Sequence, residues 1–172
     1  MARYLVDTNH IRFMMDRPDL RQRVDRSRGL GDRFGISIPI LCELEAGISG
    51  AMNPARLRGA LDGILNHLRV WPMDAQTAKI FGQLHADLRR RGRSLSTVDI
   101  TSAALAHQLG LTILSADADF QALPDIKVED WTSPRAKPLE PLRLSVSPPL
   151  PLPPHAGNWL STRSASALIC AA

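Results

Sequence analysis

The sequence predicts an α/β protein with three layers, in which a central, mainly parallel sheet is flanked by helices. Short apolar runs that favour strands alternate with longer segments whose apolar residues recur at helical spacing. Strands separated by helices pair in parallel, because each crossover returns the chain to the same end of the sheet. The 172 residues suit one domain of ordinary size with a proper core.

The first element is an apolar run at residues 3–6, which predicts a buried strand. It ends abruptly in Asp7, Thr8 and Asn9. Ligands of open α/β sheets bind just beyond the carboxyl ends of strands, so Asp7 is a candidate site residue. Asp is also a common helix N-cap, and this segment alone leaves both roles open.

The remaining elements are predicted from hydrophobic periodicity and from residues that cap or break helices. The predicted helices are 10–28 with a break near Pro18, 39–48, 53–68, 75–91 and 96–109. The predicted strands after the first are 34–38, 70–73, 111–114 and a last one around 126–128. Asn53 and Asp74 are expected to cap helices, and Gly110 is expected to end one.

The composition changes at Pro134. Eight of the 13 prolines lie between Pro134 and Pro154, charges become sparse, and the chain ends rich in Ser and Ala. Such a segment cannot bury a core. We therefore expect one folded domain at 1–133 and a proline-rich, disordered tail at 134–172.

The charge balance is a weak indication of a polyanionic partner. The sequence pI is about 9.7, but residues 1–133 carry 17 basic against 16 acidic side chains. Any basic surface must therefore be local. One arginine face lies on 17–28, where it is also consistent with a solvated surface paired to nearby Asp. A second cluster ends the helix 75–91, namely Arg89, Arg90, Arg91 and Arg93. Cations are favoured there without a ligand, yet this is the best candidate for phosphate contacts.

Cysteine content and hydropathy indicate the compartment. Cys42 and Cys170 form neither a disulfide framework nor a metal-binding spacing, which favours a reducing environment. No apolar run reaches the roughly 18 residues of a membrane span. We expect a soluble, cytoplasmic protein without membrane contact.

Acidic residues gather at one predicted edge of the sheet. Asp7 follows the first strand, Glu43 follows the second, and Asp117 and Asp119 follow the strand 111–114. Glu43 is expected in the first turn of its helix, where the macrodipole also favours a carboxylate. Asp99 begins the helix that feeds the strand 111–114, so it belongs to the same edge.

A common position for these acids is hard to explain by helix capping alone. Clustered carboxylates repel one another unless a cation lies among them. An oxygen-only set without Cys or a His pair favours Mg²⁺ or Mn²⁺. His10 is nearby in sequence, but a lone His beside a strand end is expected to pack rather than to act in the site.

Four segments resemble, in order and spacing, the motifs of the PIN domain. They are Leu5-Val6-Asp7-Thr8-Asn9, Cys42-Glu43-Leu44-Glu45-Ala46-Gly47, Asp99 ahead of Ala103-Ala104, and Leu114-Ser115-Ala116-Asp117-Ala118-Asp119-Phe120. The likeness covers about residues 2–131 and is nearest to the VapC-type toxins of prokaryotic toxin–antitoxin pairs. Each motif alone is weak, whereas the combination is specific. Ser115 stands where the family often has Thr, and the proline-rich tail has no counterpart.

The resemblance implies a divalent-metal-dependent endoribonuclease that is the toxin of a type II toxin–antitoxin module. Asp7, Glu43, Asp99 and Asp117 match the family's acidic quartet, with Asp119 as an auxiliary acid. Asn9 and Ser115 are expected to contact the metal ligands or the substrate, and Arg89, Arg90, Arg91 and Arg93 to meet RNA phosphates. The implied partners are RNA, a cognate antitoxin protein and a second copy in a homodimer.

Three alternatives remain open on the sequence. A phosphatase of the haloacid dehalogenase type also begins with Asp after a first strand, but it needs a second Asp where this chain has Asn9. A binding module would use the acids only as caps. An RNA-processing nuclease would share the chemistry without being a toxin.

Overall fold

The computed structural model describes residues 1–123 and 125–132. It contains one sheet of five strands: β1 (Arg3–Val6), β2 (Arg33–Ile36), β3 (Arg69–Val70), β4 (Thr112–Leu114) and β5 (Lys127–Glu129). The strand order is β3-β2-β1-β4-β5, and every pairing is parallel. The predicted tail at 134–172 and the boundary at 133 lie outside the described residues.

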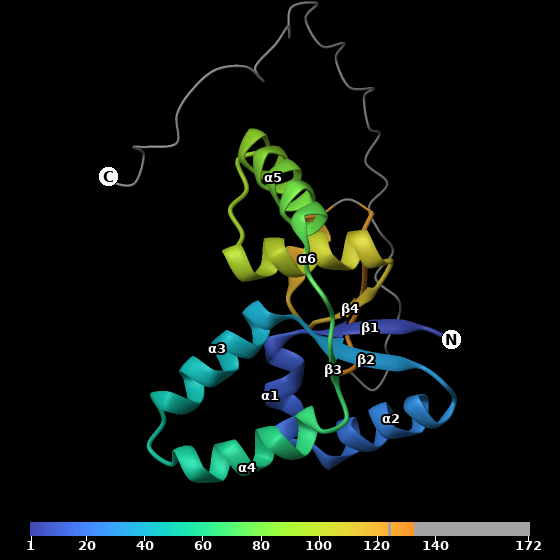
Figure 1. Ribbon diagram of the computed structural model, residues 1–172, viewed down its shortest axis with the longest axis vertical. Helices are drawn as coiled ribbons and strands as arrows, with labels where there is room; N and C mark the ends of the chain where they lie inside the picture. The colour runs from blue at the N-terminus through green and yellow to red at the C-terminus, as the bar shows by residue number, and fades with distance from the viewer. Residues whose placement is uncertain (124, 133–172) are drawn as a thin grey trace, which may run out of the picture.

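Helices cover both faces of the sheet. They are α1 (Thr8–Asp16), α2 (Pro18–Gly29), α3 (Ile38–Ser49), α4 (Pro54–Leu65), α5 (Ala75–Arg90) and α6 (Thr97–Leu109), with a 3-10 helix η1 at Ala118–Ala122. Figure 1 shows α5 and α6 above the sheet and α1, α2 and α4 below it. This arrangement confirms the predicted three-layer fold. No helix in the described part of the chain has the length and apolar character to cross a membrane.

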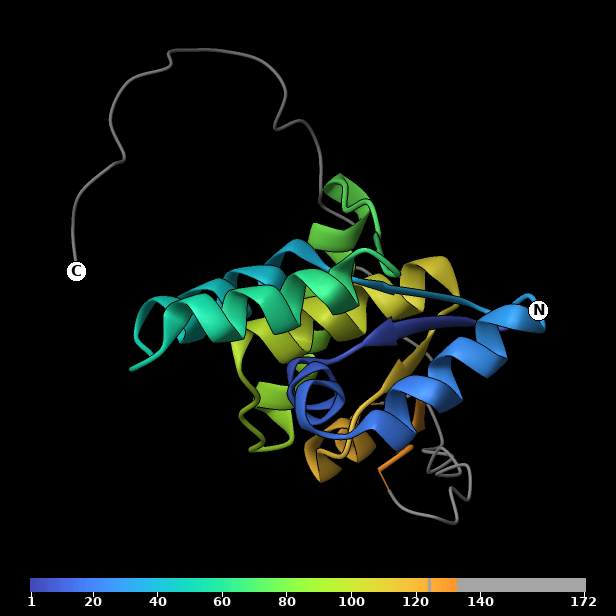
Figure 2. The ribbon, with the colours of Figure 1, turned by 90° about the horizontal axis from the view of Figure 1, so that it is seen from below.

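The core lies between the sheet and these helices. The strands β1 and β2 are buried along three of their four residues, as expected for a parallel sheet covered on both faces. On α6, Ala103, Ala104 and Ala106 are buried, and such small side chains allow the helix to approach neighbouring elements closely. α3 and α4 lie alongside each other (Figure 2) and are joined by an ion pair between Glu45 and Arg58.

Several boundaries differ from the predicted ones: α1 begins at Thr8 rather than at residue 10, α4 ends at Leu65 rather than at residue 68, and two strands are shorter than predicted. The strand predicted at 34–38 ends at Ile36, because Ser37 caps α3 and accepts a hydrogen bond from the Ile40 N–H at 3.4 Å. α3 therefore begins at Ile38, and Glu43 lies in its second turn rather than its first. The prediction of a first-turn Glu43 is wrong, and the helix macrodipole, which acts over the first turn, does not explain this carboxylate.

The strand predicted at 70–73 is reduced to the two residues of β3. The Trp71 N–H still donates to the Ile36 carbonyl at 2.9 Å, but Pro72 has no N–H with which to continue the ladder. The 3-10 helix η1 was not predicted; Asp117 caps it by accepting from the Asp119 N–H. The predicted caps at Asn53, Asp74 and Gly110 are confirmed.

The arginine face on 17–28 is used largely for internal contacts. Arg17 donates to the Thr132 carbonyl at 2.8 Å, and the Arg23 guanidinium lies 4.3 Å from the Trp131 ring centroid. Trp131 in turn packs edge-on against Tyr4 and Phe34. These contacts hold the end of the described chain against α2.

Gly35 is required by a close approach between β2 and β3. A Cβ at this position would lie 2.4 Å from the Arg69 carbonyl oxygen and 2.7 Å from the Trp71 indole nitrogen. The indole N–H donates to the Tyr4 carbonyl at 3.0 Å and cannot move away without losing that bond.

We expect Gly35→Ala to lower the free energy of unfolding by about 2 kcal/mol or more, because the added methyl group forces the backbone of β2 or β3 to shift. Gly59→Ala is the matched control, since nothing lies within 4 Å of its Cβ and it occupies the exposed face of α4. Ala there is expected to add about 0.5–1 kcal/mol. Chemical unfolding of both variants checks this, and equal stabilities would contradict the close approach.

Candidate active site

The site lies where the order of the strands reverses. The chain passes from β1 to β2 on one side, and β4 later pairs with the other side of β1. Crevices at such switch points, beyond the carboxyl ends of the strands, are the usual ligand sites of open α/β sheets. The Asp7 N–H donates to the Leu114 carbonyl at 3.1 Å, so the ladder between β1 and β4 extends to the first residue of the site.

Asp7 is the buried acid of this crevice, with 6 % of its surface exposed. One carboxylate oxygen accepts from the Thr8 N–H at 2.7 Å as the cap of α1, and the other accepts from the Ser115 hydroxyl at 2.7 Å. Burial raises the pKa of Asp7 to about 6 and outweighs these hydrogen bonds, and the negative charges of Asp99 and Glu43 raise it further. Asp7 therefore caps α1, and burial destabilises the ionised form of its side chain.

Glu43 on α3 and Asp99 on α6 are close enough to Asp7 for their charges to raise its pKa, and the two helices contact each other. Glu43 accepts a hydrogen bond from the Thr8 hydroxyl at 2.7 Å. Asp99 accepts from the Ser96 hydroxyl at 2.6 Å, and Ser96 also caps α6. Burial raises the pKa of Asp99, and the charges of Asp117 and Glu43 add to this effect.

Asp117 follows β4 and completes the predicted quartet. Its backbone N–H donates to the Ser115 hydroxyl oxygen at 3.0 Å, and its carboxylate caps η1 by accepting from the Asp119 N–H at 2.8 Å. The auxiliary Asp119 is exposed on that short helix. The structure thus gathers Asp7, Glu43, Asp99 and Asp117 at one edge, with Asp119 at its periphery.

The chemistry of this set fits a hard divalent cation. All its donors are carboxylate oxygens, and within residues 1–123 and 125–132 none of the five acids forms an ion pair with Lys or Arg. In the same part of the chain, no three Asp, Glu, His or Cys side chains are close enough together to hold an ion as a group. Binding a metal would therefore require the carboxylates to move towards one another.

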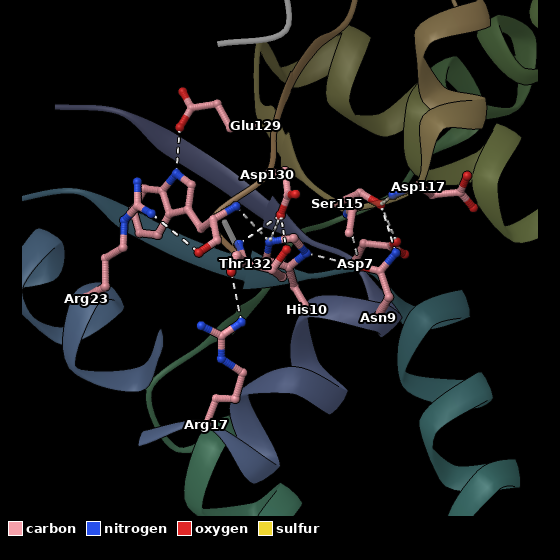
Figure 3. Close-up of polar contacts among 12 residues, drawn as sticks. Asp7, Asn9, His10, Arg17, Arg23, Ser115, Asp117, Glu129, Asp130 and Thr132 are labelled. Carbon is pink, nitrogen blue, oxygen red and sulfur yellow. Dashed lines mark hydrogen bonds and ion pairs between the residues drawn. The ribbon is translucent and has the colours of Figure 1, made fainter. Parts of the chain in front are cut away.

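Asn9 and Ser115 are in direct contact with the acids. The Asn9 amide nitrogen donates to the Ser115 hydroxyl oxygen at 3.0 Å, and the Asn9 amide oxygen accepts from the Ala116 N–H at 3.4 Å. Figure 3 shows Asn9, Ser115 and Asp7 grouped together, with Asp117 extending from the same turn. Thr8, which was not predicted as a site residue, supports both Asp7 and Glu43; its position directly after Asp7 was the available signal.

His10 is buried behind this group, with 1 % of its surface exposed. Its Nε2 accepts from the Trp131 N–H at 3.1 Å, and its Nδ1 lies 3.0 Å from the Asn9 amide oxygen. Burial lowers the pKa of His10 to about 4, although Asp130 opposes this shift. The imidazole is therefore neutral at pH 7 and packs as expected, but its link to Asn9 was not predicted.

The second arginine cluster lies at the end of α5. Arg89 and Arg93 line a hollow of about 320 Å³ together with Leu95 and Ile100, beside the start of α6 that carries Asp99. Arg90 forms an ion pair with Asp87, and Arg91 is exposed at the C-cap. Two of the four predicted arginines thus line a hollow that also includes Ile100, the residue after Asp99.

Asp7 gives a testable dependence of stability on pH in EDTA. Because folding raises its pKa from 3.8 to about 6, the folded state binds the proton more tightly, and this contribution is lost as the pH rises from about 4 to 6. Asp7→Asn cannot ionise, so it should become more stable than wild type across that window, by about 1–3 kcal/mol at pH 7. Thermal unfolding from pH 4 to 8 measures this, with exposed Asp62→Asn as control. An advantage that shrinks as the pH rises would contradict it.

Comparisons with known proteins agree with this fold. A family model described as the PIN domain matches residues 4–126. Over 134 residues the chain is 30% identical to the tRNA(fMet)-specific endonuclease VapC of Salmonella typhimurium, covering 76% of this chain and 99% of that protein. It is 25% identical to Ribonuclease VapC2 of Haemophilus influenzae, again covering 76% and 99%.

Solved structures show the same architecture. DNA-bound VapBC from Salmonella typhimurium matches with a TM-score of 0.69 and 29% identity, over 76% of this chain and 99% of that chain. VapBC2 from Rickettsia felis, bound to a promoter DNA fragment, matches in fold with a TM-score of 0.71 and 22% identity, over 75% and 98%. The chain belongs to the PIN domain family, and its relatives place it among the VapC-type proteins of that family.

Proposed function

We propose that this protein is a divalent-metal-dependent endoribonuclease that hydrolyses RNA phosphodiester bonds as the toxin of a type II toxin–antitoxin module. The observation that carries the proposal is Asp7, a buried carboxylate without a cationic partner in the described chain, at the strand switch point of a PIN domain. The buried charge of Asp7 lowers the stability of the fold, and a cation that binds this carboxylate explains why it is there.

The four acids of the edge have distinct roles in this proposal. Asp7 and Asp117 hold a Mg²⁺ or Mn²⁺ ion directly, and Glu43 and Asp99 complete the site directly or through water. When bound, such an ion lowers the pKa of a water molecule and neutralises charge on the phosphate. The hydroxyls of Ser115, Thr8 and Ser96 each donate to one of these acids and orient its remaining lone pairs.

The substrate strand lies across the edge towards α5. Arg89 and Arg93, which line the hollow beside α6, contact phosphates on one side of the cleaved bond. Arg90 and Arg91 add positive charge further out. Contacts of this kind bind RNA without reading its sequence.

The family relationship supports the partners. A relative of this chain is named a tRNA(fMet)-specific endonuclease, which makes tRNA the first RNA to test. The similar solved structures are VapBC complexes, and we propose a cognate antitoxin that silences the enzyme in the cytoplasm. Self-association as a homodimer stays a prediction, which sedimentation can check.

Removal of a central acid should abolish cleavage. We expect Asp7→Asn and Asp117→Asn to lower the rate of RNA cleavage in Mn²⁺ by at least about 100-fold, because each removes a metal ligand. Asp62→Asn, an exposed acid on α4, is the control and should cleave at the wild-type rate. Quantitative cleavage assays with and without EDTA measure this.

The outcomes of that assay separate the alternatives. Equal activity of Asp7→Asn and wild type would overturn the proposed site. A wild-type protein that neither binds Mn²⁺ nor cleaves RNA would favour the binding module, and hydrolysis of phosphomonoesters alone would favour a phosphatase. An active nuclease whose expression leaves growth unaffected would favour RNA processing over a toxin.

Arg89 and Arg93, which line the hollow at the end of α5, should contribute to RNA binding rather than to the cleavage step. We expect the double change Arg89→Ala and Arg93→Ala to raise KM for RNA and to reduce the slope of log affinity against log salt by about 0.7 for each phosphate that is no longer neutralised. Arg56→Ala, an exposed arginine on α4, is the matched control. Fluorescence titrations at several salt concentrations test this; an unchanged slope would remove these residues from the RNA path.

A further inference from the structure

A chain of hydrogen bonds runs from the backbone of Trp131 to the carboxylate of Asp7. Figure 3 labels its four side chains, His10, Asn9, Ser115 and Asp7. The links of this chain are Trp131 N–H to His10 Nε2 at 3.1 Å, His10 Nδ1 to Asn9 Oδ1 at 3.0 Å, Asn9 Nδ2 to Ser115 Oγ at 3.0 Å, and Ser115 Oγ to Asp7 Oδ2 at 2.7 Å. The four side chains come from the end of β1, the first turns of α1 and the end of β4. The chain thus joins the last described residues to the proposed metal site.

The direction of the chain is determined at its Trp131 end. A backbone N–H only donates, so His10 Nε2 must accept. A neutral imidazole then carries its proton on Nδ1, and burial keeps the ring neutral at pH 7. Nδ1–H therefore donates to Asn9, which places the amide oxygen of Asn9 towards His10 and its amide nitrogen towards Ser115.

The same direction follows independently at the other end. The Ala116 N–H also donates to the Asn9 amide oxygen, which agrees with this orientation of the amide. Ser115 Oγ accepts from both Asn9 Nδ2 and the Asp117 N–H, so both of its lone pairs are used. Its single hydrogen is left to donate to Asp7.

We propose that His10 is a positioning residue for the acidic site, because its Nδ1–H holds the Asn9 amide in the orientation that makes the Ser115 hydroxyl donate to Asp7. This inference rests on the proposed function of that site. Without the donor at Nδ1, only the longer hydrogen bond from the Ala116 N–H, at 3.4 Å, holds the amide oxygen of Asn9, and the amide can turn over and present its oxygen to Ser115. The Ser115 hydrogen then has a second acceptor, and Asp7 loses the donor that fixes its orientation.

His10 also has an ordinary structural role, and the two roles use different ring nitrogens. Nε2 accepts from Trp131 and lies 3.6 Å from an Asp130 carboxylate oxygen, so this side of the ring anchors the end of the described chain. Nδ1 faces Asn9 alone among the described residues. A substitution that keeps one nitrogen's function and removes the other's can therefore separate anchoring from positioning.

Asparagine and glutamine provide that separation. The amide nitrogen of Asn occupies nearly the place of Nδ1, and the amide of Gln reaches the place of Nε2. His10→Asn keeps a donor for Asn9 and loses the acceptor for Trp131, whereas His10→Gln keeps the acceptor and loses the donor. Each variant is compared with wild type in Mn²⁺ affinity by calorimetry, in thermal unfolding, and in kcat and KM for RNA.

We expect His10→Gln to weaken Mn²⁺ binding by about 10–100-fold and to lower kcat with KM nearly unchanged, the size usual for groups that orient metal ligands. We expect His10→Asn to unfold at a lower temperature while its Mn²⁺ affinity stays within about threefold of wild type. Mn²⁺ affinities that follow the loss of thermal stability in both variants would reduce His10 to an anchor and overturn the proposal.

The protonation of the ring tests the same claim in the metal-free wild type. Nitrogen-15 NMR should find the proton of His10 on Nδ1, and a proton on Nε2 would overturn the proposal even if a variant failed to fold. Wild-type protein that neither binds Mn²⁺ nor cleaves RNA would overturn the proposed function, whichever nitrogen is protonated. Normal wild-type activity together with an unaffected His10→Gln would overturn the positioning role alone.

Discussion

The parallel pairing of β1 with β4 is the constraint on which the rest of the structure depends. It places the reversal of strand order between these two strands, and it extends one hydrogen bond further, from the Asp7 N–H to the Leu114 carbonyl. The residues that follow the two strands therefore lie side by side, so Ser115 can reach Asp7. The helices α3 and α6, which contact each other, then bring Glu43 and Asp99 to this edge.

This arrangement destabilises the ionised side chain of Asp7. A carboxylate with 6 % of its surface exposed loses most of its hydration, and two hydrogen bonds do not restore it, so its pKa remains raised. Protein interiors usually pair such a charge with Lys or Arg. Here the neighbouring charges have the same sign, which is poor for folding and suited to binding a cation. The acidic edge is thus a place where function opposes stability.

Much of this organisation could be predicted from the sequence, because it rests on local patterns. Apolar periodicity located the helices, and caps such as Asp74 and Asn53 gave their beginnings. The acids were assigned to one edge because each follows a strand or begins a helix in a regular α/β order. The strand 34–38 was predicted too long because Ile36 and Ile38 continue the apolar alternation across Ser37, which in the structure caps a helix.

What could not be predicted depends on contacts between distant segments. The link from His10 to Trp131 joins residues 121 positions apart, and no local pattern reports which side of an imidazole meets which partner. The contact of Arg23 with the Trp131 ring is a second case. It could not be predicted, because the sequence of α2 shows which residues are charged but not which of them contact a distant segment. The separation of the carboxylates is also a tertiary property, and sequence motifs cannot give it.

The anchoring of Trp131 has a consequence for where the functional unit ends. The family match stops at residue 126, yet the Trp131 ring stacks beneath Arg23 and its backbone supports the chain of hydrogen bonds that leads to Asp7. A fragment cut at residue 126 would keep Asp7, Glu43, Asp99 and Asp117 and lose the Trp131 N–H that His10 accepts. The contacts that support the acidic edge thus extend past the residue at which the family model ends.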